Sequence, residues 1–170
     1  PGSHATEVPG DGIDTDCDGI DACSDLNCDA WPDILIAQVN HLSDPVSSDV
    51  LIYFGSEDGF SEEDTLSLPT VQAPHATTAD LDGDGYVDIV VSEDPVSFFS
   101  FGTDGHVRVY WGSASGHSTD DITEMPIFMS WGTSAFDMND DGYLELGIAT
   151  FDEDGIEAGE RGDYETAANT

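Results

Sequence analysis

Residues 80–91 read Asp80-Leu81-Asp82-Gly83-Asp84-Gly85-Tyr86-Val87-Asp88-Ile89-Val90-Val91 and carry the strongest structural signal in this chain. Acidic side chains stand at positions 1, 3, 5 and 9 of the first nine residues, and glycine stands at position 6. Because glycine adopts positive φ angles at little cost, the backbone can turn sharply at that position. The apolar run that follows is typical of a short buried strand. The pattern therefore predicts a tight acidic loop that leads into a strand.

The same loop occurs twice more along the chain. One copy starts at Asp25 and the other at Asp137, so that the starts are 55 residues (25 to 80) and 57 residues (80 to 137) apart. A second motif, an apolar strand that ends in an aromatic residue, Gly and Ser, repeats in phase, with Gly55 and Gly112 also 57 residues apart. Two motifs that share one period indicate an architecture built from stacked copies of one unit.

Each unit carries the signals of β-strands. The segment from Val107 to Trp111 is β-branched and aromatic, and Gly-Ser and Asp-Gly pairs mark turns. No segment has the pattern of an amphipathic helix of ten residues. We therefore expect an all-β fold of repeated antiparallel blades, a partial β-propeller of about three units. The units start near residues 25, 80 and 137, and the last one is incomplete.

The acidic loop leading into an apolar strand, followed by the aromatic-Gly-Ser turn, resembles the FG-GAP or VCBS repeat. The resemblance spans roughly Asp25 to Phe151. It implies blades of the integrin-α-type β-propeller, which also occur in many secreted bacterial surface proteins. Propellers have about four to eight blades, more than the units present here. The resemblance thus implies either a piece of a longer protein or a subunit whose neighbours complete the stack.

The segment before the repeats divides into two parts. Residues 1–10 contain Gly2-Ser3-His4 and are interpreted as a flexible terminus or tag remnant, and residues 25–170 hold the repeats. Residues 11–24 form an acidic Cys-containing motif that resembles the calcium motifs of thrombospondin type 3 repeats or bacterial surface proteins. We expect one disulfide among three cysteines, as suits an oxidising compartment, and which two pair stays open. Their spacing fits no usual zinc site. The cysteines are Cys17, Cys23 and Cys28.

The loops have the oxygen donors that calcium prefers. Calcium takes about 6–8 oxygen ligands in flexible geometry, whereas magnesium demands a rigid octahedron, so calcium is the expected ion and magnesium the weaker competitor. Positions 1, 3, 5 and 9 would supply side-chain oxygens and position 7 a backbone carbonyl. The expected ligands are Asp80, Asp82, Asp84, Tyr86 and Asp88; Asp137, Asn139, Asp141, Tyr143 and Glu145; Asp25, Asn27, Asp29, Trp31 and Asp33; and, in an N-terminal fourth site, Asp14, Asp16, Asp18 and Asp21. We expect two to four bound calcium ions.

The candidate sites are unequal. In the first loop Ala30 replaces the glycine at position 6, and an alanine in the left-handed conformation costs about 1 kcal/mol or more. Pro32 also stiffens the end of that loop. Asp25 could instead close the N-terminal site at position 12 of an EF-hand-like ring, and it would then bridge two ions. The Asp80 loop is therefore the best predicted site, and the Asp25 loop a distorted one.

Composition limits the partners of the chain. Its 170 residues include 37 Asp or Glu and 2 Lys or Arg, for a formal net charge of −35. Such a charge repels nucleic acid and anionic lipid, and it destabilises a compact state unless cations bind. A disordered acidic chain is the alternative interpretation. The 3 Trp, 5 Tyr and 8 Phe and the apolar runs favour a folded protein with counter-ions. No apolar run is long enough to cross a membrane, and no signal peptide is recognised.

Nothing in the sequence indicates catalysis. The five histidines lack metal-ligand spacing and are interpreted as surface residues, and with so many acids a glycosidase-like carboxylate pair arises by chance. The tryptophans are expected in the blade core, with an exposed Trp131 or Phe98 as the alternative. We expect a non-enzymatic, secreted or cell-surface calcium module for adhesion, recognition or assembly, with a protein or glycan partner. The alternatives are a filament or surface-layer subunit that self-associates and a lectin-like propeller.

Overall fold

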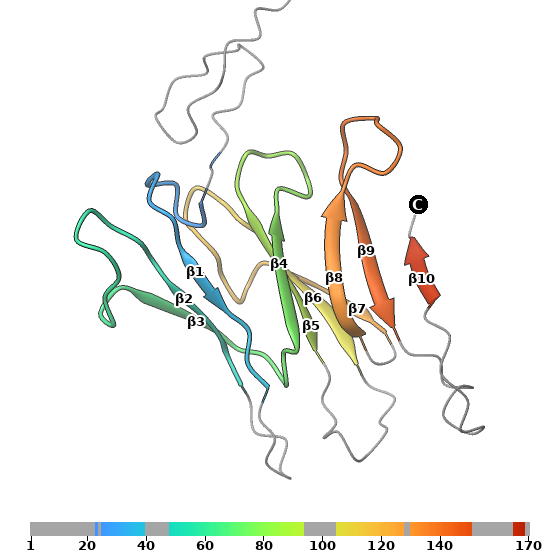
Figure 1. Cartoon of the computed structure of the whole chain (residues 1–170), viewed down its shortest axis with the longest axis horizontal. Coiled ribbons are helices and arrows are strands. Elements are labelled where there is room, and N and C mark those ends of the chain that lie inside the picture. Colours follow the sequence, from blue (N-terminus) through green and yellow to red (C-terminus); the bar gives the residue numbers. More distant parts are fainter. Residues whose placement is uncertain are drawn as a thin grey trace, which may run out of the picture.

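The computed structural model describes Cys23, residues 25–39, 48–93, 105–127 and 130–150, and the backbone of residues 165–168. The described residues form antiparallel sheets joined by turns, which confirms the expected all-β fold class (Figure 1). The strands are β1 (Ile34–Ile36), β2 (Val50–Tyr53), β3 (Thr65–Leu68), β4 (His75–Ala79), β5 (Asp88–Glu93), β6 (His106–Tyr110), β7 (Ile122–Pro126), β8 (Ser130–Phe136), β9 (Glu145–Thr150) and β10 (Glu165–Ala168). Within these residues, no helix long and apolar enough for a membrane span is found.

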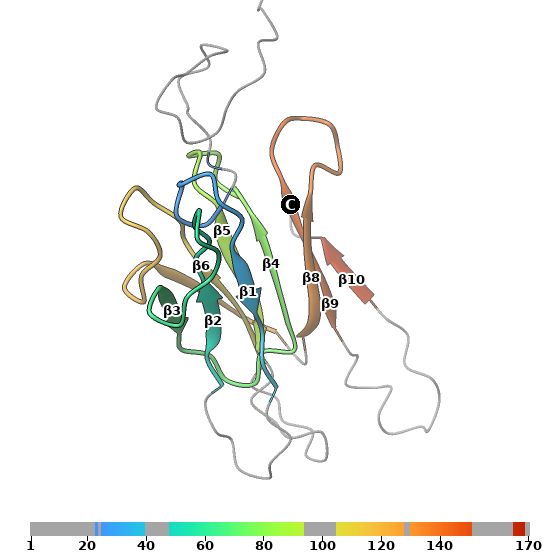
Figure 2. The ribbon, with the colours of Figure 1, turned by 60° about the vertical axis from the view of Figure 1, so that its left-hand side comes forward.

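The strands build three sheets that follow one another along the chain. The first has the order β1-β2-β3, the second β4-β5-β6-β7 and the third β10-β9-β8, and all neighbours are antiparallel. The second sheet lies between the first and the third (Figures 1 and 2). Sequential strands paired as meanders, in sheets stacked face to face, are consistent with consecutive blades of a propeller.

The middle sheet is covered on both faces because successive residues of a strand point to opposite sides. Ile89 and Val91 of β5 pack against the first sheet in one apolar core, together with Ile52 of β2. Val90 points the other way and packs with Ile148 of β9 in a second core. All six residues of β5 are therefore buried. The apolar run that follows the second acidic loop is the centre of the molecule.

Side chains of β6 in the second sheet bind the backbone that follows β3 of the first sheet. The Arg108 guanidinium on β6 lies 2.9 Å from the Glu93 carboxylate and donates to the carbonyl of Pro69, which follows β3, at 2.7 Å. The Tyr110 hydroxyl also donates to the Pro69 carbonyl. Burial raises the pKa of Glu93, and the Arg108 charge opposes that shift. One of the two basic side chains of the chain thus serves the contact between blades.

Two tryptophans are not in the core, contrary to expectation. The side chain of Trp31 is 44% exposed and that of Trp131 is 41% exposed, whereas Trp111 packs at the edge of the second core. The register of β8 against β9 shifts between Ser130 and Gly132, so Trp131 is the extra residue of a bulge. Trp31 lies in the first acidic loop, ahead of β1.

Candidate metal centre

The three acidic loops lie at the same end of the molecule (Figure 1). Residues 80–88 connect β4 to β5, residues 137–145 connect β8 to β9, and residues 25–33 precede β1. Each loop therefore delivers its last acidic residue to the start of a strand. Because the sheets stack in the same orientation, the loops lie at equivalent positions in successive blades.

The second loop folds around the carboxylate of Asp80. One oxygen of Asp80 accepts the backbone N–H groups of Gly83 at 2.8 Å and Asp84 at 3.2 Å, and the other accepts that of Gly85 at 2.9 Å. Gly83 and Gly85 have φ angles of 75° and 90°, in the left-handed region. This backbone turns the N–H groups inward, as in the anion-binding concavities made by successive N–H groups.

Asp88 holds the loop closed from its other end. Its two oxygens accept the N–H groups of Leu81 and Gly112, each at 2.8 Å, and its side chain is 1% exposed. Gly112 belongs to the aromatic-Gly-Ser motif after β6, and a Cβ built there would lie 2.5 Å from the Val87 carbonyl oxygen. The close approach and the hydrogen bond explain why the two sequence motifs share one period.

Three carboxylates of the second loop converge. Oxygens of Asp80, Asp82 and Asp88 all lie within 4.8 Å of one another. Calcium–oxygen distances are about 2.3–2.6 Å, so oxygens on opposite sides of one ion are about 5 Å apart, and all three can contact the same ion. Burial raises the pKa of Asp88 to about 6, and burial and the Asp84 carboxylate raise that of Asp82. Three converging carboxylates on one short loop are a donor set that fits a calcium ion.

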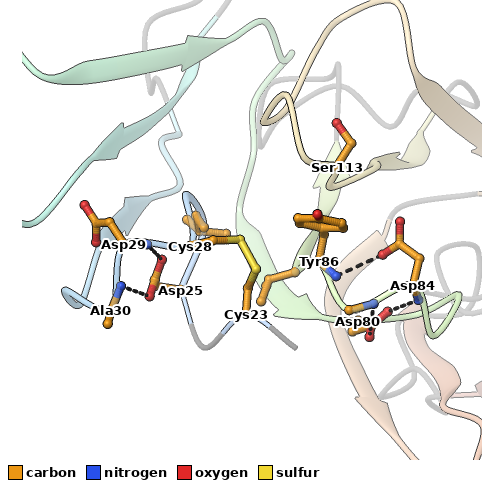
Figure 3. Close-up of a disulfide and its surroundings, with 12 residues drawn as sticks. Cys23, Asp25, Cys28, Asp29, Ala30, Asp80, Asp84, Tyr86 and Ser113 are labelled. Atoms are coloured by element: carbon orange, nitrogen blue, oxygen red, sulfur yellow. Dashed lines mark hydrogen bonds between the residues drawn. A yellow bond between two sulfur atoms is a disulfide. The ribbon is translucent and has the colours of Figure 1, made fainter. Parts of the chain in front are cut away.

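Asp84 and Tyr86, the other two predicted ligands of this loop, are joined by a hydrogen bond. One carboxylate oxygen of Asp84 accepts the N–H of Tyr86 at 2.9 Å, as Figure 3 shows, and this bond fixes the backbone at position 7. Asp84 is not among the converging oxygens. The structure thus brings Asp80, Asp82 and Asp88 together, while metal coordination by these three residues, by Asp84 and by Tyr86 stays a prediction.

The first loop repeats these hydrogen bonds on a less suitable sequence. Asp25 accepts the N–H groups of Asp29 at 3.1 Å and Ala30 at 2.9 Å. Asp29 accepts the N–H of Trp31 at 2.8 Å, and Asn27 donates its amide to Asp29. Ala30 adopts a φ angle of 67°, so the expected left-handed alanine is present.

Asp33 closes the first loop as Asp88 closes the second. It accepts the N–H groups of Leu26 at 2.8 Å and of Gly55 at 2.9 Å. A Cβ on Gly55 would lie 2.2 Å from the Pro32 carbonyl oxygen. Burial has the largest effect on the Asp33 carboxyl and raises its pKa. The hydrogen bonds from these two N–H groups act in the opposite direction and lower that pKa. The first and second units are therefore built alike at both motifs.

The third loop has the same framework and is more exposed. Asp137 accepts the N–H groups of Asp141 and Gly142, and the Gly142 bond, the largest contribution, lowers the pKa of Asp137. Asp141 accepts the N–H of Tyr143 at 2.9 Å. Glu145 accepts the N–H of Met138 at 2.6 Å and the Asn139 amide at 3.2 Å.

Among the described residues, the three carboxylates that converge closely enough to share one ion are those of the second loop. The first and third loops carry Asn at position 3, so their donor sets have one carboxylate fewer. Their metal binding stays a prediction. The N-terminal candidates Asp14, Asp16, Asp18 and Asp21 lie outside the described residues, and so does the EF-hand-like ring that Asp25 would close.

The cysteine pairing left open by the sequence is Cys23 with Cys28 (Figure 3). Their Cα atoms are 5.0 Å apart, and Cys28 is position 4 of the first loop. Cys28 has a φ angle of 61°, and its equivalent in the third loop, Asp140, has 59°. Left-handed backbone at position 4 was missed, because only the glycine of the second loop marks it in the sequence. Cys17 lies outside the described residues.

His117 is a second residue that the sequence did not single out. Its Nε2 donates to the Val87 carbonyl at 2.8 Å, and its Nδ1 is buried without a hydrogen-bond partner. Burial lowers its pKa, so the ring is neutral near pH 7. His117 is thus a partly buried support for the end of the second loop, and the surface interpretation was wrong for this histidine. In the sequence, His117 occupies the position after the repeated turn glycine that Phe60 occupies in the preceding unit, and this equivalence was the available signal.

Comparison with protein-family models identifies residues 25–91 as an FG-GAP-like repeat. These residues include the first and second loops and the buried run of β5. No curated protein and no solved structure gave a match. The resemblance to FG-GAP repeats is therefore confirmed over residues 25–91, and the resemblance of residues 11–24 to thrombospondin-type motifs stays a prediction.

Proposed function

We propose that this chain is a calcium-binding β-blade module with a structural role and no catalysis. The observation that carries the proposal is the convergence of the Asp80, Asp82 and Asp88 oxygens within 4.8 Å, inside an FG-GAP-like repeat. The three side chains are hard oxygen donors on one short loop, which is the donor set that calcium prefers.

Calcium would stabilise the blade through residues that already hold it together. Asp88 links the loop to Gly112 after β6, and Asp80 organises the turn between β4 and β5. An ion between them would offset carboxylate repulsion at the point where three strands meet. Because the ion binds the folded state, it adds about 2.7 kcal/mol of stability at a concentration 100 times its Kd.

The site of action that we propose is extracellular or on the cell surface. The Cys23–Cys28 disulfide suits an oxidising compartment, and millimolar calcium is common outside cells. There the module would serve adhesion, recognition or assembly.

Thermal unfolding with calcium and with chelator tests the proposal. For a chain of this size about 2.7 kcal/mol corresponds to about 5–10 °C in Tm, which millimolar calcium should add. Asp80→Asn should remove much of that gain. Asp58→Asn, which removes the same charge from an exposed turn, should keep it. A wild-type Tm that is the same in calcium and in chelator contradicts the proposal.

A role as an assembling subunit is the second candidate, and exposed apolar side chains favour it. Ile34 and Ile36 on β1 and Trp131 and Phe136 on β8 are all about 40% exposed, and they lie in the two outer sheets. Sedimentation of the chain at rising calcium concentration tests this role. Growth in mass that Trp131→Ser reduces would support assembly, and a monomer throughout would exclude it.

A further inference from the structure

One disulfide contacts both of the first two acidic loops. Cys28 is position 4 of the first loop, and its partner Cys23 donates its backbone N–H to the carbonyl of Gly85, at position 6 of the second loop, at 2.7 Å. Figure 3 shows the sulfur–sulfur bond between the Asp25 side and the Asp80 side of the site. The crosslink therefore lies within the candidate metal centre.

The first loop has more need of such support than the second. Both loops require left-handed backbone at positions 4 and 6, and the second loop has Gly83 and Gly85 there. The first loop has Cys28 and Ala30, with φ angles of 61° and 67°. Side chains with a Cβ disfavour this conformation, and it persists only where the surroundings hold it. At position 4, the disulfide is such a constraint.

We propose that the Cys23–Cys28 disulfide is a redox-controlled lock on the first calcium loop, an inference that rests on the proposed calcium function. In the oxidised chain the bond to Cys23 restrains Cys28 in its left-handed conformation. The next two N–H groups, of Asp29 and Ala30, then point at the Asp25 carboxylate and fix it as a ligand. Reduction frees Cys28 to relax, and the Asp25 carboxylate loses its orientation.

The reduction step is a thiol–disulfide exchange with a dithiol. The disulfide accepts two electrons and two protons and becomes the thiols of Cys23 and Cys28, and the dithiol loses the same and becomes a cyclic disulfide. The second loop keeps its own glycines in either redox state. Thiols should therefore change the conformation of the first loop directly. The second loop is linked to the disulfide only by the hydrogen bond from Cys23 to Gly85 and should change less.

Calorimetric calcium titration of the whole chain, before and after dithiothreitol, tests the lock. A Cys17→Ser background prevents exchange with the third cysteine, and Asp80→Asn in that background silences the second loop. Reduction should weaken the remaining first-loop binding by about tenfold, which corresponds to about 1.4 kcal/mol. Asp25→Asn instead of Asp80→Asn leaves the second loop, whose affinity should change much less.

Two variants sharpen the experiment. Cys23→Ser with Cys28→Ser should bind as weakly as the reduced chain and ignore dithiothreitol. Ala30→Gly removes one of the two unfavourable residues, so it should recover part of the affinity in the reduced state.

Hydrogen exchange at Asp29 and Ala30 gives a readout besides calcium, and their protection should fall on reduction. If the oxidised chain binds calcium at the first loop and reduction changes neither affinity nor protection, the lock is wrong and the proposed function stands. If neither redox state binds calcium at any loop, the proposed function itself is wrong.

Discussion

The first and second acidic loops reach the same backbone by different means. In both, the aspartate at position 1 accepts the N–H at position 6, and the aspartate at position 9 accepts the N–H at position 2 and that of a distant glycine. The second loop uses glycines where the backbone is left-handed, and the first uses Cys28 and Ala30. The hydrogen-bond pattern, and not the glycines alone, therefore defines this loop.

The two loops also differ in the environment of their last carboxylate. Asp88, at the start of β5, is 1% exposed, whereas Asp33, ahead of β1, is partly exposed. Burial raises the pKa of both, and that of Asp88 reaches about 6. The blade with a neighbour on each side thus makes its carboxylate more dependent on its two N–H donors and on a cation.

Removal of these carboxylates should give the largest difference between the loops. Asp88→Ala leaves the N–H groups of Leu81 and Gly112 without an acceptor in a buried place. Each such group costs about 1–3 kcal/mol, so we expect a loss of about 3 kcal/mol or more. Asp33→Ala removes two hydrogen bonds that are only partly buried, at a side chain that is itself partly exposed, and should cost about 1 kcal/mol. Urea unfolding in chelator measures both free energies without the contribution of calcium.

Equal losses for the two variants would show that burial does not distinguish the loops. The m-value serves as the control, because an unchanged slope shows that both variants unfold from the same compact state.

The next largest effect should come from the glycine that faces each loop. A Cβ at position 112 would lie 2.5 Å from the Val87 oxygen, and one at position 55 would lie 2.2 Å from the Pro32 oxygen. Backbone must move in both cases, and overpacking of this kind costs about 1–3 kcal/mol. Gly55→Ala should be at least as destabilising as Gly112→Ala. Gly132→Ala is the control, since Gly132 lies outside the left-handed region and a Cβ there meets the Ala149 Cβ at 4.0 Å, an ordinary contact.

Thermal unfolding with calcium in excess should also show a smaller calcium gain for Gly112→Ala, because the substitution would displace Asp88 from the proposed calcium site. A full gain would separate the packing of Gly112 from the metal centre.

The sequence predicted the parts that depend on neighbouring residues. The positions of the three loops, the strand after each loop and the strained Ala30 all follow from residue types a few positions apart. The strands before the second and third loops, His75–Ala79 and Ser130–Phe136, were not predicted. They are rich in Thr, Ser, Ala and Gly, and partners in the adjacent strands select their conformation.

Contacts between distant residues were beyond the reach of the sequence. The shared period of the two motifs was visible, but its reason, a hydrogen bond across 24 residues from Gly112 to Asp88, was not. His117 was missed for the same reason, because the Val87 carbonyl that it binds is 30 residues away. Which cysteine pairs with Cys28 likewise depended on how the chain enters the first loop.

The smallest predicted effect isolates the left-handed residue at position 6. Ala30→Gly relieves the unfavourable φ angle but makes the unfolded chain more flexible, so the net gain should be about 0.5–1 kcal/mol. Gly142→Ala makes the opposite change at the same position of the third loop, where a Cβ would meet no atom within 4 Å, and should lose about as much. Urea unfolding in chelator measures both free energies. If Ala30→Gly gives no gain, the first loop holds its alanine without strain, and position 6 does not account for its difference from the second loop.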